Sequence, residues 1–212
     1  MRAFLFFLTL LFLNACGNED GNKPGKSDSM SAKDSLKKAM REDLPPPSEI
    51  KQFNWFYSAF VHSATIADDS VFNAFIHPEY GLWIIHSEGA IPAFTRVTKI
   101  GDYKTSNGKK LLPLDRDKML ADPKEEELPK VDCDKKSFYD KEGCFTSERN
   151  LFAENKIWEY AGLTPDEDKQ VASLAKTITR TVINTATYRF YFSLINGSWY
   201  LTFIDVRKPC EA

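Results

Sequence analysis

Two aromatic-rich segments near the end of the chain flank Asn196-Gly197, the pair preferred in two-residue type I′ turns of β-hairpins. Such a turn fixes the register of both strands, because residues equally far from the turn must face one another. Counting residues outwards from the turn predicts strands at 188–195 and 198–206. One face of this hairpin is apolar and ends in a phenol and a carboxylate. The expected pairs are Ile195 with Ser198, Leu194 with Trp199, Phe192 with Leu201, Phe190 with Phe203 and Tyr188 with Asp205.

The segment after residue 48 has the spacing of an amphipathic helix. Six apolar residues recur three and four apart, which predicts a helix that Ser48 caps and that runs to about residue 64. These residues are Phe53, Phe56, Tyr57, Phe60, Val61 and Ala64. Asp68 or Asp69 caps a second, shorter helix. The domain therefore opens with helices whose aromatic side chains face a core.

The middle and later parts of the chain add further helices and strands. Residues 147–161 are expected to be helical, and Thr164-Pro165-Asp166-Glu167 supplies a cap, a first-turn proline and two acids for a helix ending near Ala175. Strand patterns rich in β-branched and aromatic residues lie at 81–87, 93–100 and 177–183. We predict an α+β fold in which N-terminal helices pack on an antiparallel sheet that ends in a C-terminal aromatic meander.

Residues 104–146 interrupt these patterns with Pro, Lys, Asp and Glu. Ten acidic residues face seven basic ones between Asp115 and Glu142, which predicts a solvated acidic loop insertion. Two stretches that begin at Asp115 and Asp132 resemble calcium loops in their first residues only. The first has Met and Leu at its fifth and sixth positions, and the second has Gly143 where a twelfth-position Glu is needed. We predict no metal site.

Near the start of the sequence, Arg2 precedes a largely apolar run over residues 3–13. Roughly eleven residues suit a signal peptide and are too few to span a bilayer. Leu13-Asn14-Ala15-Cys16 follows, and this tetrapeptide resembles the lipobox of bacterial lipoproteins. The resemblance implies cleavage before Cys16 and acylation of its sulfur, so that acyl chains hold the protein on a membrane. The alternative is a buried N-terminal helix with an incidental cysteine.

Residues just behind Cys16 indicate which membrane is involved. Gly17 is similar to the residue found in lipoproteins that move to the outer membrane of Gram-negative bacteria, and Glu19-Asp20 resembles the export signal of surface-exposed lipoproteins in the Bacteroidota. We therefore expect an outer-membrane, lipid-anchored protein. Its periplasmic face and the cell surface both stay open as locations.

The chain divides into three parts. Residues 1–15 form the expected signal peptide, 16–48 the lipidated cysteine and a disordered tether poor in large apolar side chains, and 49–212 a single α+β domain. The formal net charge is −2, and the tether carries no basic cluster. This charge argues against nucleic acid as a partner.

Helices first and an aromatic antiparallel meander last resemble the NTF2-like fold, the cone-shaped α+β sheet shared by ketosteroid isomerase and many binding modules. The resemblance lies in the order of elements over the domain, and it implies a curved sheet around an apolar pocket, often with one acid as proton base. It makes Asp205, Tyr188 and His86 the pocket candidates, with Asp205 as general base. The alternative is that Asp205 ends a strand and only accepts hydrogen bonds.

The four cysteines are expected to differ in their chemical state. Cys16 takes lipid, which leaves Cys133, Cys144 and Cys210 in an oxidising compartment, where they permit three single pairings. We predict a disulfide between Cys133 and Cys144, which closes a short loop and stabilises by roughly 2–3 kcal/mol. Pairing of Cys144 with Cys210 is the alternative, and a free, reactive Cys210 is a further possibility.

Motifs for several kinds of chemistry are missing from the sequence. The three histidines, His62, His77 and His86, form no His-Glu-x-x-His motif, and there is no Cys-x-x-Cys, Gly-x-Ser-x-Gly or phosphate-binding glycine loop. We expect a non-catalytic binding or interaction module that needs no cofactor, whose partners are the membrane and a small ligand, a glycan or an envelope protein. The alternative is an NTF2-like isomerase or hydrolase that uses Asp205 as its base.

Overall fold

The computed structural model describes residues 49–66, 68–87, 89 and 91–210, and the expected signal peptide, Cys16, tether and capping Ser48 lie outside this range. The helices and 3-10 turns are α2 (Glu49–Thr65), α3 (Asp69–Asn73), η1 (Ile100–Asp102), α4 (Leu151–Asn155), η2 (Ile157–Tyr160) and α5 (Pro165–Ala175). The strands are β1 (Leu82–Ser87), β2 (Pro92–Val97), β3 (Lys124–Glu125), β4 (Cys144–Ser147), β5 (Ile178–Asn184), β6 (Arg189–Ile195) and β7 (Ser198–Asp205). Within this part of the chain, no helix has the length and apolar character that crossing a membrane requires.

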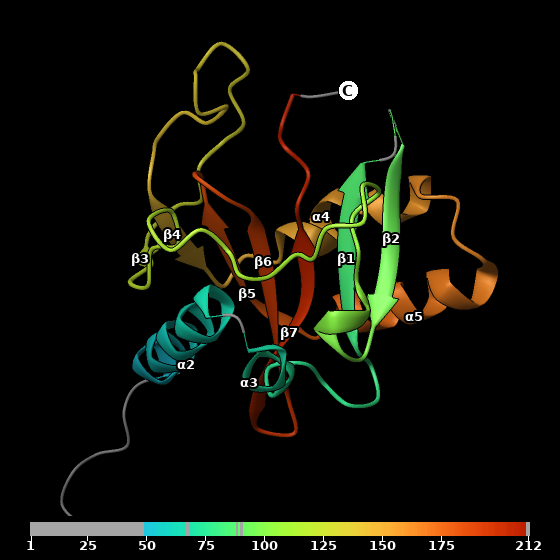
Figure 1. The fold of residues 1–212 in the computed structure, drawn as a ribbon. Coiled ribbons are helices and arrows are strands. Elements are labelled where there is room, and N and C mark those ends of the chain that lie inside the picture. Colours follow the sequence, from blue (N-terminus) through green and yellow to red (C-terminus); the bar gives the residue numbers. More distant parts are fainter. Residues whose placement is uncertain (1–48, 67, 88, 90, 211–212) are drawn as a thin grey trace, which may run out of the picture. The chain divides into compact units, whose positions relative to one another are not determined.

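The strands form one seven-stranded sheet in the order β2-β1-β7-β6-β5-β4-β3 (Figure 1). β1 runs parallel to β7 and β3 runs parallel to β4, while the other neighbours are antiparallel. The predicted α+β class is confirmed, but the sheet is mixed and not antiparallel throughout. The side chains of β1 alternate between the two faces of the sheet, and both faces are buried over its first four residues. The parallel neighbour of β1 comes from the far end of the chain.

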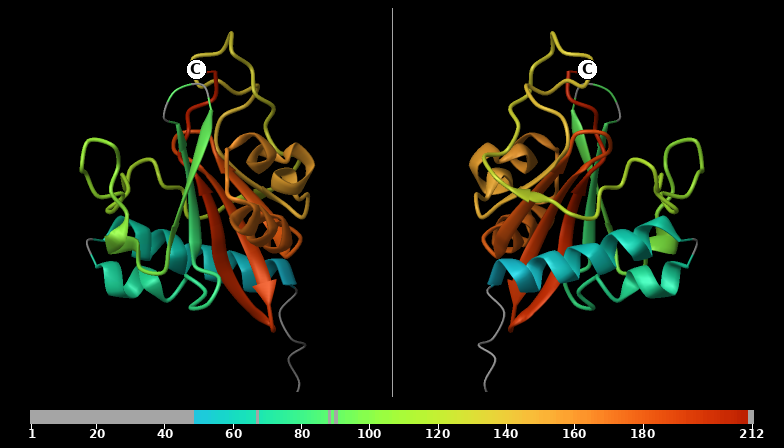
Figure 2. Two further views of the ribbon diagram at one scale, coloured as in Figure 1. Left: turned by 90° about the vertical axis from the view of Figure 1, so that its right-hand side faces the viewer. Right: turned by 90° about the vertical axis from the view of Figure 1, so that its left-hand side faces the viewer.

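Helices cover both faces of the sheet (Figures 1 and 2). α2 and α3 pack on one face, and α4, η2 and α5 pack on the other. β1 contributes to both layers, because Leu82 and Ile84 point into the first core and Trp83 and Ile85 into the second. The strand predicted at residues 81–87 therefore separates the two cores.

The aromatic face of α2 fills the first core. Phe53, Tyr57 and Phe60 are fully buried. The ring of Phe60 lies 5.3 Å from that of Phe190 and 5.4 Å from that of Phe192, both edge-on. The apolar face of the C-terminal meander is therefore covered by helix side chains and encloses no open cone at this place.

Helix α5, which packs into the second core, starts with the expected capping box. The Thr164 hydroxyl accepts a hydrogen bond from the Glu167 backbone N–H at 3.4 Å, and the Glu167 carboxylate accepts one from the Thr164 N–H at 3.0 Å. Leu174, near the end of the helix, packs into a cluster with Phe152 and Phe203, whose rings stack at 4.2 Å. The cap and the boundary near Ala175 are confirmed.

The single helix expected over residues 147–161 is wrong. Ser147 ends β4, and two short helices, α4 and η2, follow in its place. Lys156 between them has φ 45°, a left-handed conformation that ends the α-helical run. Asn150 caps α4, and its amide donates a hydrogen bond at 2.8 Å to the carbonyl of Ala175. Tertiary contact with the end of α5 therefore decides where α4 begins.

The β6–β7 hairpin follows the predicted register only near its turn. The pairs from Ile195 with Ser198 to Phe192 with Leu201 are confirmed, but Tyr191 then faces Phe203, which leaves Thr202 as an extra residue in β7. The Thr202 hydroxyl lies 2.9 Å from that of Ser193. The bulge turns Phe203 to the second core, so its expected pairing with Phe190 is wrong. Asp205 accordingly faces Arg189 and not Tyr188.

Both predicted disulfides are wrong, because the bond joins Cys133 to Cys210, whose Cα atoms lie 5.8 Å apart. Cys144 is the free thiol of the described residues. It starts β4 and is buried beside Tyr57, with its sulfur 3.4 Å from the phenol oxygen. Cys210 is therefore not a free nucleophile, and the thiol that stays reduced is the one inside the sheet.

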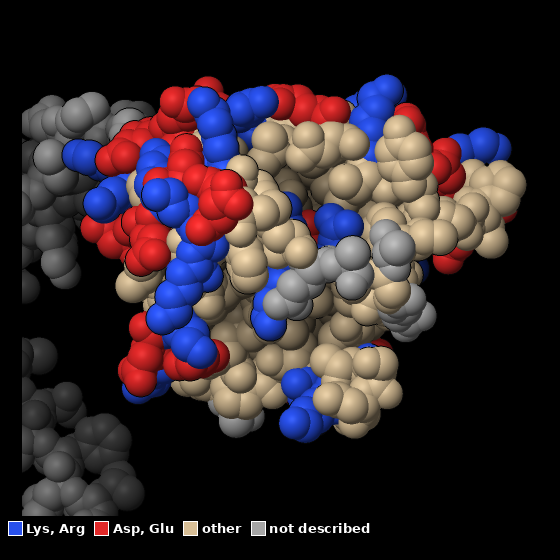
Figure 3. All heavy atoms as spheres, turned by 90° about the horizontal axis from the view of Figure 1, so that it is seen from above, with Lys and Arg blue, Asp and Glu red and all other residues tan. Residues whose placement is uncertain are grey.

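The acidic insertion expected over residues 104–146 ends earlier than predicted, because residues 144–146 belong to β4, and it contains one short strand, β3. Seen from above, Asp, Glu, Lys and Arg side chains gather on the side of β3 and β4, while much of the opposite side is neither acidic nor basic (Figure 3). Ion pairs within the insertion include Lys118 with Asp115 at 3.0 Å and Lys141 with Glu126 at 3.5 Å. This side is a solvated surface of mixed charge.

Candidate functional site

Asp205, the predicted general base, is buried in an ion-pair cluster. Its two carboxylate oxygens each accept a hydrogen bond of 2.8 Å from the guanidinium of Arg207, and Arg189 lies 3.2 Å away. Only 1% of Asp205 is exposed. Both of its oxygens are thus already engaged with cations, and its geometry is that of a structural counter-ion.

The other two predicted pocket residues lie elsewhere. Tyr188 lines a pocket of about 450 Å³ beside the acidic insertion, and His86 lines a different one of about 380 Å³ at the end of β1. The His86 Nε2 lies 3.0 Å from the Thr95 hydroxyl on the neighbouring strand. Asp205 lines neither pocket. The structure therefore does not bring the three residues together.

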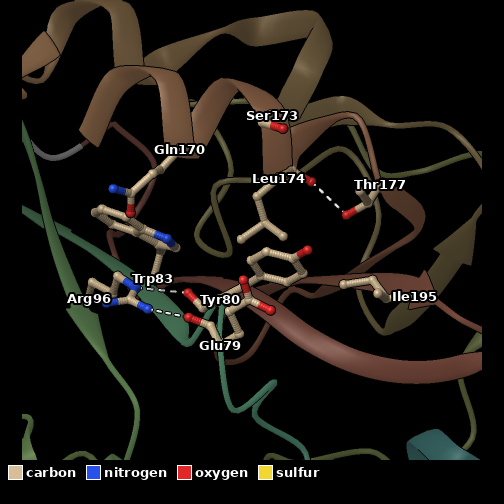
Figure 4. A pocket seen from close by; sticks show the side chains of 9 residues that line it. All are labelled: Glu79, Tyr80, Trp83, Arg96, Gln170, Ser173, Leu174, Thr177 and Ile195. Carbon is tan, nitrogen blue, oxygen red and sulfur yellow. Dashed lines mark hydrogen bonds between the residues drawn. The ribbon is translucent and has the colours of Figure 1, made fainter. Parts of the chain in front are cut away.

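A cleft of about 390 Å³ opens between the β1–β2 hairpin and α5 (Figure 4). Its volume lies within the range of small-molecule sites. Six parts of the chain contribute to it: the turn before β1, strand β1, strand β2, helix α5, Thr177 just before β5, and the end of β6. The lining residues are Glu79, Tyr80, Trp83, Arg96, Gln170, Ser173, Leu174, Thr177 and Ile195.

Apolar side chains form the inner surface of the cleft. Trp83 and Leu174 are buried, at 2% and 5% exposure, and Ile195 lies at the far side. Tyr80 is 41% exposed, and its ring lies beneath Leu174 in Figure 4. An exposed aromatic ring next to an apolar surface offers a flat contact to a ligand.

The turn that carries Tyr80 is firmly held. The Nδ1 of His77 accepts hydrogen bonds from the backbone N–H groups of Glu79 and Tyr80 at 3.1 and 3.2 Å. The His77 ring also stacks on the Tyr80 ring at 4.4 Å. Gly81 follows with φ 71°, and a Cβ there would lie 2.7 Å from the carbonyl oxygen of Val97. The position of the tyrosine ring is therefore set by its own turn.

Polar groups of several kinds surround this apolar surface. The guanidinium of Arg96 donates a hydrogen bond of 2.9 Å to the Tyr80 carbonyl and a second to the Glu79 carbonyl, which fixes its plane. The Glu79 carboxylate accepts hydrogen bonds, and the Gln170 amide both donates and accepts. Thr177 is already engaged, since its hydroxyl donates to the Leu174 carbonyl at 2.7 Å. The cleft can thus bind a ligand that has an apolar face and several hydrogen-bonding groups.

The sequence patterns did not predict this cleft. Its residues are scattered over more than a hundred positions, and none belongs to a catalytic or ligand-binding motif. The one available signal was Trp83, which alternates with Leu82 and so had to face a second layer. In the described part of the chain, no group of three His, Cys, Asp or Glu side chains could hold a metal ion.

Comparisons of the sequence with protein-family models and curated proteins, and of the structure with solved structures, give no match. The assignment of function therefore rests on the geometry of the cleft and on the chemistry of its residues.

Proposed function

We propose that the protein is a lipid-anchored binding module of the bacterial outer membrane that holds a sugar unit of a glycan in the cleft of Figure 4. The anchor is proposed from the similarity of Leu13–Cys16 to a lipobox. The role is non-catalytic binding, and the protein brings its ligand to the envelope.

One observation carries the choice of ligand: a fixed, exposed Tyr80 ring borders an apolar surface and is surrounded by donors and acceptors in roughly equal measure. A sugar ring has an apolar C–H face that stacks on aromatic rings. Its hydroxyl groups both donate and accept, which matches the Arg96 guanidinium, the Glu79 carboxylate and the Gln170 amide. A purely apolar ligand would displace water from the Glu79 carboxylate and the Gln170 amide without replacing its hydrogen bonds, at a cost in free energy.

Affinity electrophoresis of the full chain in detergent, through gels that contain soluble polysaccharides, tests this proposal. A bound glycan retards the protein, and Tyr80→Ala should weaken retardation roughly five- to tenfold, the loss expected for one aromatic contact. Tyr160→Ala is the matched control, because Tyr160 is 72% exposed and lies outside the cleft. Equal retardation of both variants, or no retardation of the unmodified chain by any glycan in the panel, contradicts the proposal.

Anchoring is tested separately by labelling cells with a palmitate analogue. The chain should incorporate the label and fractionate with the outer membrane, and Cys16→Ser should do neither. Label on the Cys16→Ser chain contradicts lipidation at this residue.

A further inference from the structure

We infer a second ligand site, for a small carboxylate with an apolar body, in the pocket of about 450 Å³ that Tyr188 lines. We call it the clamped pocket; four segments form its wall, residues 111–118, 136–139, 185–188 and 206–209. It shares no residue with the cleft of Figure 4 and so does not depend on the proposed glycan function.

Aromatic and aliphatic side chains form the body of the clamped pocket. Tyr139 and Leu114 are buried, at 5% and 6% exposure, and Phe138 and Tyr188 are half-buried. Burial raises the pKa of the Tyr188 phenol, which therefore stays protonated and can donate a hydrogen bond. A ligand with an apolar body and a hydrogen-bond acceptor fits this lining.

Charge decides which acceptor the pocket favours. Two lysines, Lys118 and Lys136, line it together with a single acidic residue, Asp115. Asp115 forms an ion pair with Lys118 at 3.0 Å, and Lys136 adds a positive charge that no other acidic residue of this lining balances. An anionic ligand is therefore preferred over a neutral or cationic one of the same shape.

The disulfide holds two walls of the clamped pocket in place. Cys133 lies in the loop that carries residues 136–139, and Cys210 follows the segment 206–209. The loop is closed at its base by the Asp140 N–H, which donates to the Lys130 carbonyl at 3.0 Å. Phe138 has φ 61°, which is rare for an aromatic residue and is found where the surroundings enforce it. A site whose walls are fixed beforehand loses little conformational entropy on binding.

Three probes of one skeleton test the charge preference: 3-phenylpropionate, 3-phenylpropanol and 3-phenylpropylammonium. They are titrated by ligand-observed NMR against the full chain in detergent, with empty micelles as the blank. The carboxylate should bind more tightly than the other two. Equal binding of all three, or no binding of the carboxylate, overturns the proposal.

Matched lysine variants locate the site. Lys136→Gln should weaken binding of 3-phenylpropionate about threefold, as for one exposed ion pair, and leave the alcohol unchanged. Lys135→Gln removes the same charge from the neighbouring position, which does not line the pocket, and should change neither. Equal effects of the two variants, or loss of binding in Tyr80→Ala, would place the probe elsewhere and overturn the assignment.

The clamp is tested by the double variant Cys133→Ser, Cys210→Ser, with circular dichroism to confirm that it folds. Its affinity for 3-phenylpropionate should fall roughly tenfold, because two walls must then be ordered by the ligand. Unchanged affinity in the folded variant overturns the clamp. Should this variant not fold, Tyr188→Ala still tests the site, and full retention of binding overturns it.

Discussion

Replacement of Asp205 by Asn separates a structural role for this carboxylate from the role of a general base. Asp205 is 1% exposed and lies within 3.2 Å of two guanidinium groups, those of Arg189 and Arg207. The amide of Asn has nearly the same shape but no charge, so the change leaves two arginines without their counter-ion. Their side chains are only 15% and 19% exposed, so water can replace the lost carboxylate only in part.

Breaking a buried ion pair by removal of one partner costs about 3–5 kcal/mol. Because Arg207 lies at the end of the sheet and can turn partly towards water, we expect the lower end of this range, about 3 kcal/mol. With a urea dependence of about 2 kcal/mol per molar, the unfolding midpoint should fall by about 1.5 M. Unfolding of the purified chain in urea, followed by circular dichroism, measures this shift.

Two further variants complete the test. Asp117→Asn makes the same chemical change at an exposed position and should shift the free energy of unfolding by less than about 0.5 kcal/mol. The double variant Asp205→Leu, Arg189→Met should recover only part of the lost stability, because it removes the Arg189–Asp205 pair together but leaves Arg207 without the carboxylate. A midpoint for Asp205→Asn equal to that of the unmodified chain would refute the structural role and return Asp205 to the candidates for catalysis.

Three other expectations concern cysteines and a helix cap. Burial raises the pKa of the Cys144 thiol from 9.0 to about 11, so the neutral thiol stabilises the fold below pH 9 and this contribution, about 2.7 kcal/mol, is lost as the pH rises to 11. The difference between the pH profiles of unfolding for the unmodified chain and Cys144→Ala measures this loss, and identical profiles would contradict it. Removal of the Cys133–Cys210 disulfide, which joins residues 77 positions apart, should lower the free energy of unfolding by roughly 2–5 kcal/mol in urea titrations. An unchanged free energy of unfolding would show that the bond does not stabilise the fold. Thr164→Ala should cost about 1 kcal/mol by loss of the α5 cap, whereas Thr164→Ser should cost little, and equal losses would rule out the hydroxyl as the cause.

Local structure in this chain was largely predictable because its signals are local. The spacing of Phe53, Tyr57 and Phe60 depends on the period of one helix, and the capping box at Thr164 depends on four consecutive residues. The turn at Asn196-Gly197 needs two left-handed residues, which these types adopt readily, and both have positive φ in the structure. Each prediction needed only the geometry of the chain within a few residues.

Predictions that needed information from distant segments failed. One extra residue at Thr202 shifts the β7 register, and a single-residue shift moves every later side chain to the other face. That shift pairs Asp205 with Arg189 and removes it from the face of Tyr188. The Thr202 hydroxyl in the bulge contacts the Ser193 hydroxyl on the neighbouring strand. The residues around the turn contain no signal that predicts this bulge.

The sequence by itself determined the α+β class, the helix faces and the hairpin, because propensity, capping and side-chain period act within a few residues. Only the tertiary structure decided the parallel pairing of β1 with β7, the Cys133–Cys210 bond and the cleft between the hairpin and α5. Each of these joins segments that lie far apart along the chain. Their meeting depends on how the two cores pack on one sheet, and no short stretch of sequence encodes that packing.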